Sequence, residues 1–127
     1  MKLVYNQLVK LNGVLKEIEN NSMPFKLSLI VAKNLATIAP EVQFFVAKEM
    51  EFAQNYLEFN ENGLPVETSP GVYKIKSGML KECQEARAEL DNFEVDVNLR
   101  MIPISLIENM NFTPAQLAAM EFLIEEE

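Results

Sequence analysis

The chain has 127 residues, of which 49% are hydrophobic, so it is long enough for one domain with a core and too apolar for a disordered chain. Its formal net charge of −8, from 11 basic and 19 acidic residues, argues against direct binding to nucleic-acid phosphates. The acidic excess lies in residues 41–127, because residues 1–40 hold five lysines and only two glutamates. We therefore expect a single domain over residues 1–127, and the acidic charge suits solubility, a basic protein partner or mimicry of nucleic acid.

The first predicted element is a helix that runs from about Asn6 to Glu19. Asn6 can cap its start, and residues 2–5 form a short edge strand in an alternative interpretation. Four apolar residues recur at the spacing of one helical face and predict its buried stripe: Leu8, Leu11, Leu15 and Ile18.

A longer apolar pattern, with steps of three and four, predicts a helix over residues 25–57. Pro40 lies inside this run, and an interior proline removes one backbone hydrogen bond and clashes with the preceding turn. We therefore expect a kink or a short break between Thr37 and Pro40, with Thr37 as a cap for the second piece. The apolar stripe is wide, because Phe44 and Phe52 lie outside it, and a wide stripe indicates burial on several sides or a second face for a partner.

A second helical arm is predicted over residues 78–93, with Ser77 as its cap. Two apolar seams joined by a short connection usually pack as an antiparallel hairpin, either as core helices or as a projecting pair that grips a partner. Val46 is then expected to lie deep in the core between the arms. Residues 65–76, rich in turn signals, predict a small β-hairpin between the arms. The seam of the second arm consists of Met79, Cys83, Ala86, Leu90 and Phe93.

The end of the chain predicts a strand and a last helix. Apolar and polar residues alternate over residues 93–101, which is typical of a strand, and residues 105–110 suit one helical turn. Thr113 can cap the last helix, Pro114 suits its first position, and Gln116 can complete a capping box. The predicted fold class is therefore α+β, mainly α: an antiparallel helical hairpin with a small β-hairpin or sheet and a C-terminal helix.

No residue pattern in the sequence predicts catalysis. Histidine, the commonest general base and metal ligand, is absent. Cys83 lies on an apolar face with no histidine to activate it, and a single cysteine forms no internal disulfide, which fits a reducing cytoplasm. Asp91, Glu94 and Asp96 could hold a divalent cation, but the wet face of a strand is the simpler interpretation. We expect no enzyme, no cofactor and no bound metal.

The candidate residues for partner binding are two aromatic side chains on the first arm and a row of glutamates on the second. The first arm has more apolar surface than the short second arm covers. Either the first and last helices cover the remainder, or two chains bury it symmetrically, and we expect a homodimer through Phe44 and Phe52. The start of the chain lacks the apolar region of a signal peptide, and no apolar run reaches the length of a membrane span, so no membrane partner is expected. The glutamates are Glu82, Glu85 and Glu89.

Several short segments carry a resemblance: residues 23–26 with 32–34, residues 58–63, residues 92–97 with 102–105, and residues 112–117 before an acidic end. Together their order resembles small uncharacterised accessory proteins of tailed bacteriophages and prophages, although Pro40 departs from the continuous helix of that pattern. The resemblance implies a phage-encoded helical-hairpin protein in the cytoplasm of an infected bacterium.

Three functions follow as hypotheses. The first is a non-enzymatic protein-binding module that inhibits a host protein such as a defence factor. The second is a phage assembly chaperone or minor morphogenesis factor. The third is an enzyme that uses a carboxylate-bound metal.

Overall fold

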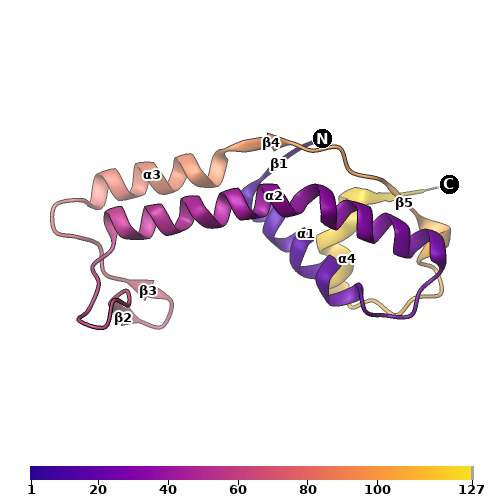
Figure 1. Ribbon diagram of the computed structural model, residues 1–127, viewed down its shortest axis with the longest axis horizontal. Helices are drawn as coiled ribbons and strands as arrows, with labels where there is room; N and C mark the ends of the chain where they lie inside the picture. The colour runs from indigo at the N-terminus through magenta and orange to yellow at the C-terminus, as the bar shows by residue number, and fades with distance from the viewer. Residues whose placement is uncertain (127) are drawn as a thin grey trace. The chain divides into compact units, whose positions relative to one another are not determined.

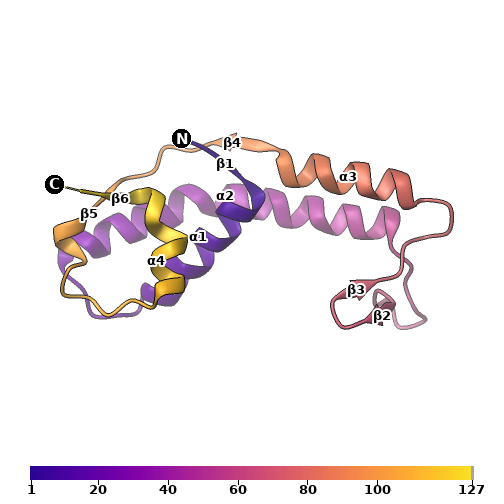
Figure 2. The same cartoon turned by 180° about the vertical axis from the view of Figure 1, so that it is seen from behind.

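The computed structural model describes residues 1–126 (Figures 1 and 2). Its elements confirm the predicted fold class, α+β and mainly α. The helices are α1 (Tyr5–Ile18), α2 (Phe25–Tyr56), α3 (Leu80–Asn92) and α4 (Pro114–Met120), with short 3-10 turns η1 (Ile104–Leu106) and η2 (Glu121–Leu123). The strands pair two by two: β1 (Lys2–Val4) with β4 (Glu94–Asp96) and β2 (Glu67–Ser69) with β3 (Val72–Tyr73), both antiparallel, and β5 (Ile102–Pro103) with β6 (Ile124–Glu125) in parallel.

The residues group into two compact units, each described here by itself. Unit 1 consists of Met1–Val42 and Glu94–Glu127, and unit 2 of Gln43–Phe93. Helix α2 gives its first part to unit 1 and its second part to unit 2. The single domain expected from the chain length stays a prediction.

Unit 1 holds most of the buried side chains. Helix α1 packs against α4, and the Gln116 side-chain amide donates a hydrogen bond to the Glu17 carboxylate at 3.1 Å. Burial of one aliphatic side chain stabilises the folded state by about 1.5–3 kcal/mol. Because most of the buried side chains lie in unit 1, this unit contains the main hydrophobic core. The predicted stripe of α1 is fully buried, together with three residues of α2, the last residue of α4 and the last residue of η2. These residues are Leu8, Leu11, Leu15, Ile18, Leu27, Val31, Ile38, Met120 and Leu123.

The start of α1 differs from the expected cap. The Val4 N–H donates to the Gln7 side-chain oxygen at 3.0 Å, and Asn6 already lies inside the helix. The physical reason is the pairing of β1 with β4, which places Leu3 opposite Val95. Since β1 ends at Val4, the helix begins at the next residue, without a loop in which Asn6 could act as a cap. The expected cap at Asn6 was therefore wrong, and the alternative of a strand at the start of the chain is confirmed.

Helix α2 is continuous through Pro40, so of the predicted alternatives, a kink or a short break, the break was wrong and the kink stays a prediction. A proline removes only one hydrogen bond from the ladder. Helix α2 extends unbroken over 32 residues on both sides of it. Thr37 does not cap a second piece, because its hydroxyl donates to the Lys33 carbonyl at 3.0 Å inside the helix.

Within residues 1–126, α2 is also long and apolar enough to cross a membrane by length and composition alone. The expectation that no apolar run reaches this length was therefore wrong. This criterion carries little weight, since the long core helix of a soluble protein passes it as well. The lack of a membrane partner stays a prediction.

One buried polar side chain organises the segment that follows β4. The Asn34 amide nitrogen donates to the Arg100 carbonyl at 3.0 Å, and its oxygen accepts from the Arg100 N–H at 2.8 Å. The strand predicted over residues 93–101 extends only to Asp96, because β1 is short. Val97 still bonds the Met1 backbone, but the Arg100 backbone bonds to a side chain instead of a strand. Asn34 is 1% exposed.

The start of α4 confirms the predicted capping box. The Thr113 hydroxyl accepts from the Gln116 N–H at 3.1 Å, and the Gln116 side-chain oxygen accepts from the Thr113 N–H at 3.0 Å. Pro114 occupies the first helical position, where its missing N–H costs no helical bond.

Replacing Thr113 with alanine is expected to lower the free energy of unfolding by about 1 kcal/mol, because a helix N–H loses its acceptor. Thermal unfolding followed by circular dichroism measures the loss. Asn111→Ala, an exposed change just before the cap, serves as the control and should leave the midpoint in place. Equal unfolding midpoints for Thr113→Ala and Asn111→Ala would show that the capping box contributes nothing to the stability of the fold.

Candidate functional site

In unit 2, α3 lies beside the second part of α2 and runs in the opposite direction (Figures 1 and 2). The Phe93 ring lies 6.1 Å from the Phe44 ring and 6.2 Å from the Phe45 ring, centroid to centroid. Further along, the Arg87 guanidinium pairs with the Glu49 carboxylate at 2.9 Å. Later positions on α2 thus meet earlier positions on α3, as in the predicted antiparallel hairpin.

The link between the two helices contains the predicted β-hairpin. Strands β2 and β3 pair there, and isolated bridges join Leu57 to Ile75 and Phe59 to Pro65. Ser77 was predicted as the cap of α3, but Met79 holds the cap position without a side-chain hydrogen bond. The cap expected of Ser77 was therefore wrong: Gly78, with φ of 77°, turns the backbone just before the helix, which places the cap position at Met79 rather than at Ser77.

The face of α2 that meets α3 is not the predicted one. Val46 is 47% exposed, so its predicted place in the core was wrong. The neighbouring residue Phe45 is fully buried, and Glu49 and Phe52 follow on the same face. One position along a helix turns the side chain by about 100°, and the larger area of the aromatic rings favours the face that carries them.

Arg87 joins the two helices. Its guanidinium bonds Glu49 on α2 and Asp91 on α3, at 2.9 and 3.0 Å, and lies 5.6 Å from the centroid of the Phe52 ring. Partial burial acts to lower the pKa of Arg87, but the hydrogen bonds to both carboxylates outweigh burial and raise it. The cation therefore stays charged and holds Phe52 at the hairpin interface.

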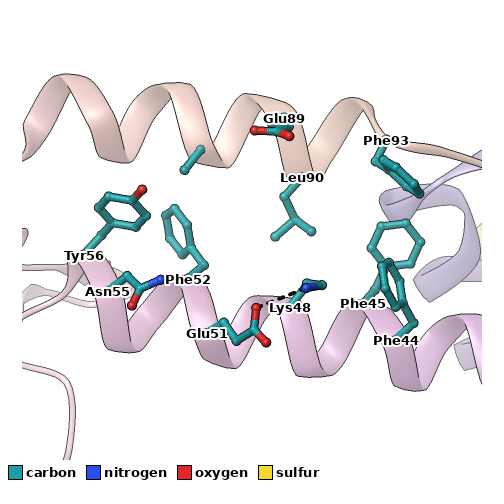
Figure 3. A pocket seen from close by; sticks show the side chains of 11 residues that line it. Phe44, Phe45, Lys48, Glu51, Phe52, Asn55, Tyr56, Glu89, Leu90 and Phe93 are labelled. Atoms are coloured by element: carbon teal, nitrogen blue, oxygen red, sulfur yellow. Dashed lines mark hydrogen bonds and ion pairs between the residues drawn. The ribbon is translucent and has the colours of Figure 1, made fainter.

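A groove of about 330 Å³ lies between α2 and α3 of unit 2 (Figure 3). We call it the hairpin groove. The Leu90 side chain extends from α3 toward α2, and the rings of Phe44, Phe45 and Phe93 gather at one end. Its lining residues are Phe44, Phe45, Lys48, Glu51, Phe52, Asn55 and Tyr56 on α2 and Ala86, Glu89, Leu90 and Phe93 on or after α3.

Of the charged side chains along the hairpin groove, those on α2 form an ion pair with each other, whereas the one on α3 has no ion-pair partner in the described structure. The Lys48 ammonium pairs with the Glu51 carboxylate at 3.2 Å and lies 5.7 Å from the centroid of the Phe44 ring. Glu89 on the opposite wall is exposed and has no ion pair in the described structure. The wall formed by α3 therefore carries an uncompensated negative charge.

Three of the five predicted partner-binding residues line the hairpin groove. They are Phe44, which is 42% exposed, the half-buried Phe52, and Glu89. Glu82 and Glu85 do not line it; they are exposed on the preceding turns of α3 and continue the acidic row that includes Glu89.

Sequence reasoning missed other lining residues, and one signal could have found two of them. Phe44, Lys48, Phe52 and Tyr56 recur every four residues, and such a row forms one ridge along a helix. Leu90 was expected only as part of the apolar seam, and which residues of that seam line a groove depends on how α3 packs.

Cys83 is buried on α3, and this burial raises the pKa of its thiol, with the charge of Arg87 acting in the opposite direction. The thiolate, which is the reactive form, is therefore scarce near neutral pH.

In the native protein, we expect Cys83 to react with a disulfide reagent on the order of a hundredfold more slowly than in the unfolded chain, as a local opening of about 3 kcal/mol would give. Absorbance at the wavelength of the released thiolate follows the reaction, with and without denaturant. Equal rates in both conditions would mean that the face of α3 that carries Cys83 is open.

Unit 1 contains a second cavity of about 680 Å³. Its walls are mainly apolar, with Glu108 and Glu121 as the charged residues. None of the predicted site residues lines it. The apolar walls belong to the 3-10 turn, the loop after it, α4 and β6: Ile104, Ile107, Met110, Phe112, Pro114, Leu117, Ala118 and Ile124.

The acidic residues considered for a metal form no cluster. The Asp91 carboxylate forms an ion pair with Arg87, and the Asp96 carboxylate forms one with the Met1 amino group at 2.9 Å. Among residues 1–126, no three cysteine or carboxylate side chains gather in a way that could hold a metal ion.

No protein-family model, no curated protein and no solved structure matches this chain.

Proposed function

We propose that this chain is a non-enzymatic protein-binding module and that unit 2 carries its binding surface. The observation that supports the proposal is the small core of this unit: of its residues, all of which are described, only Phe45 and Cys83 are buried. Exposed apolar side chains that gather in one place often mark interaction sites, and Phe44 and Phe93 gather at one end of the hairpin groove. The exposed large apolar residues of unit 2 are Phe44, Val46, Met50, Phe59, Leu64, Val72, Tyr73, Leu80 and Phe93.

The hairpin groove supplies the chemistry that such a surface needs. Aromatic side chains and arginine are enriched at protein interfaces, and the groove offers several rings with Arg87 fixed beside Phe52. Lys48, Glu51 and Glu89 add polar groups at its walls. An apolar centre with charged edges is typical of binding surfaces.

The resemblance to phage accessory proteins adds a proposal for the partner. In that proposal the groove holds a host protein, such as a defence factor, in the bacterial cytoplasm. The assembly chaperone is the second proposal, with a phage structural protein in the same groove.

Capture experiments test the binding function. The immobilised protein should retain a stoichiometric protein from bacterial lysate, and Phe44→Glu, which places a charge in the groove, should abolish retention. Phe25→Glu is the matched control, because Phe25 is 80% exposed and lies in unit 1. Lysates from uninfected and phage-infected cells distinguish a host partner from a phage partner.

Two results would contradict the proposal. One is the absence of any stoichiometric partner from both lysates. The other is a partner that Phe44→Glu and Phe25→Glu retain equally, which would place the binding surface elsewhere.

A further inference from the structure

We infer that the occupant of the hairpin groove is a single amphipathic helix whose apolar stripe is flanked by lysine or arginine. This inference rests on the proposed function and specifies the chemistry of the partner. It follows from three features of unit 2: the helical walls of the groove, its length, and the uneven charge of its edges.

The walls favour a helix over an extended peptide. Both sides of the groove are helices, so it presents no strand edge to which an extended peptide could add. The side chains of α2 form a ridge at four-residue spacing, from Phe44 through Lys48 and Phe52 to Tyr56. A third helix can place its own ridges beside this one, as helices do when they pack.

The length of the groove sets the length of the partner. From Phe44 to Tyr56 the wall of α2 extends roughly 18 Å at the helical rise. A helix of about twelve residues covers this distance in three turns and brings apolar residues at i, i+3, i+4 and i+7 to one face. Side chains of this stripe would enter beside Leu90 and between the rings of Phe52 and Phe93.

The charge of the walls determines the charge of the partner. On α2, Lys48 is already paired with Glu51. On α3, Glu82, Glu85 and Glu89 are exposed and lack ion pairs in the described structure. Of these three, Glu89 lines the groove, and Glu82 and Glu85 continue the acidic row on the preceding turns of α3. Basic residues beside the apolar stripe of a bound helix are therefore complementary to this side of the groove, and acidic residues are repelled.

The same charges argue against a second copy of this chain as the occupant. A symmetric dimer through the groove brings the same surface of two chains together. The acidic row of one chain would then approach that of the other, and like charges at an interface oppose association. The homodimer expected from the width of the apolar stripe is therefore an outcome that the experiment must test.

Selection from a display library tests the inference directly. The library contains helical peptides of about 14 residues with all surface positions randomised, and the folded protein is the target. We expect enriched sequences with an apolar stripe at helical spacing and lysine or arginine beside it. Fluorescence polarisation of an enriched peptide should show binding that weakens as salt is added.

Variants separate the role of charge from that of the groove. Combining Glu85→Lys with Glu89→Lys should weaken binding of an enriched peptide about tenfold. The matched control combines Glu61→Lys with Glu67→Lys, which makes the same change of net charge in the link of unit 2 and should change affinity by less than about twofold. Phe44→Glu should abolish binding.

Three other outcomes would each contradict one claim: the basic helix, the proposed function, or a partner other than a second copy of this chain. Enriched peptides that are acidic or lack the helical period, yet are lost with Phe44→Glu, would refute the basic helix and leave the groove in place. Failure to enrich any peptide that depends on Phe44 would count against the proposed function itself. A mass in light scattering of twice the 14.5 kDa of one chain, halved by Phe44→Glu, would make a second copy the occupant.

Discussion

Replacing Phe45 with alanine is expected to lower the free energy of unfolding by about 3–5 kcal/mol, as for other large-to-small changes at buried aromatic positions. The Phe45 side chain is fully buried, and its ring lies edge-to-face with Phe44 at 5.6 Å and with Phe93 at 6.2 Å between centroids. Its removal leaves a cavity at the end of the hairpin where α2 and the residue after α3 meet. Urea unfolding measures the effect.

Val46→Ala is the matched control for Phe45→Ala, because it shortens the next side chain along α2. Since Val46 is exposed, its truncation should change the free energy of unfolding by no more than about 0.5 kcal/mol. For the same reason Val46→Asp is expected to leave the protein folded, whereas a core position for Val46 would have made this change unfold it. A larger loss at Val46 than at Phe45 would show that the other face of α2 meets α3.

Replacing Asn34 with alanine is expected to lower the free energy of unfolding by about 2–4 kcal/mol, because each of two part-buried backbone groups loses its partner at about 1–2 kcal/mol. The Arg100 N–H and carbonyl both bond to the Asn34 amide, at 2.8 and 3.0 Å, and Asn34 itself is buried. Chemical unfolding gives the loss. Amide hydrogen exchange should also show faster exchange at Arg100.

Asn98→Ala is the control for Asn34→Ala, because it removes an exposed amide from the segment that Asn34 fixes. It should change stability by no more than about 0.5 kcal/mol. An Asn34→Ala protein as stable as Asn98→Ala, with unchanged exchange at Arg100, would contradict the role given to this side chain.

Local signals explain what the sequence could predict. The capping box before α4 involves residues three positions apart, so its geometry depends little on the rest of the fold. The α1 stripe has a single apolar face, and all four of its predicted residues are fully buried. The helical hairpin followed from two apolar patterns of helical period, although the link between them is long enough to hold strands β2 and β3.

Positions that depend on a distant partner could not be predicted in this way. The second part of α2 has apolar residues on neighbouring faces, at Phe44, Phe45 and Val46, and only the packing of α3 decides which is buried. Asn34 is polar, so hydrophobic periodicity does not mark it as a core residue. Alternation beyond Asp96 predicted a strand, but after Val97, which bonds the Met1 backbone, the Arg100 backbone bonds to the Asn34 side chain instead of a strand.

The residues of the candidate site likewise fall into those that a local sequence pattern could predict and those whose place depends on packing. Phe44 and Phe52 were found because they lie outside the main stripe of α2, and Glu89 because it belongs to an acidic row. Leu90 and Phe93 were assigned to the seam between the arms, and their place at the groove depends on how α3 packs against α2.

Nuclear magnetic resonance tests the binding role of the hairpin groove most directly. The 15N-labelled protein is titrated with a captured partner or with an enriched peptide, and the backbone amide shifts are followed. We predict that the largest changes occur at residues 44–56 and 86–93, which form the groove. Changes centred on residues 104–124, which line the cavity of unit 1, or no changes at all would contradict the account.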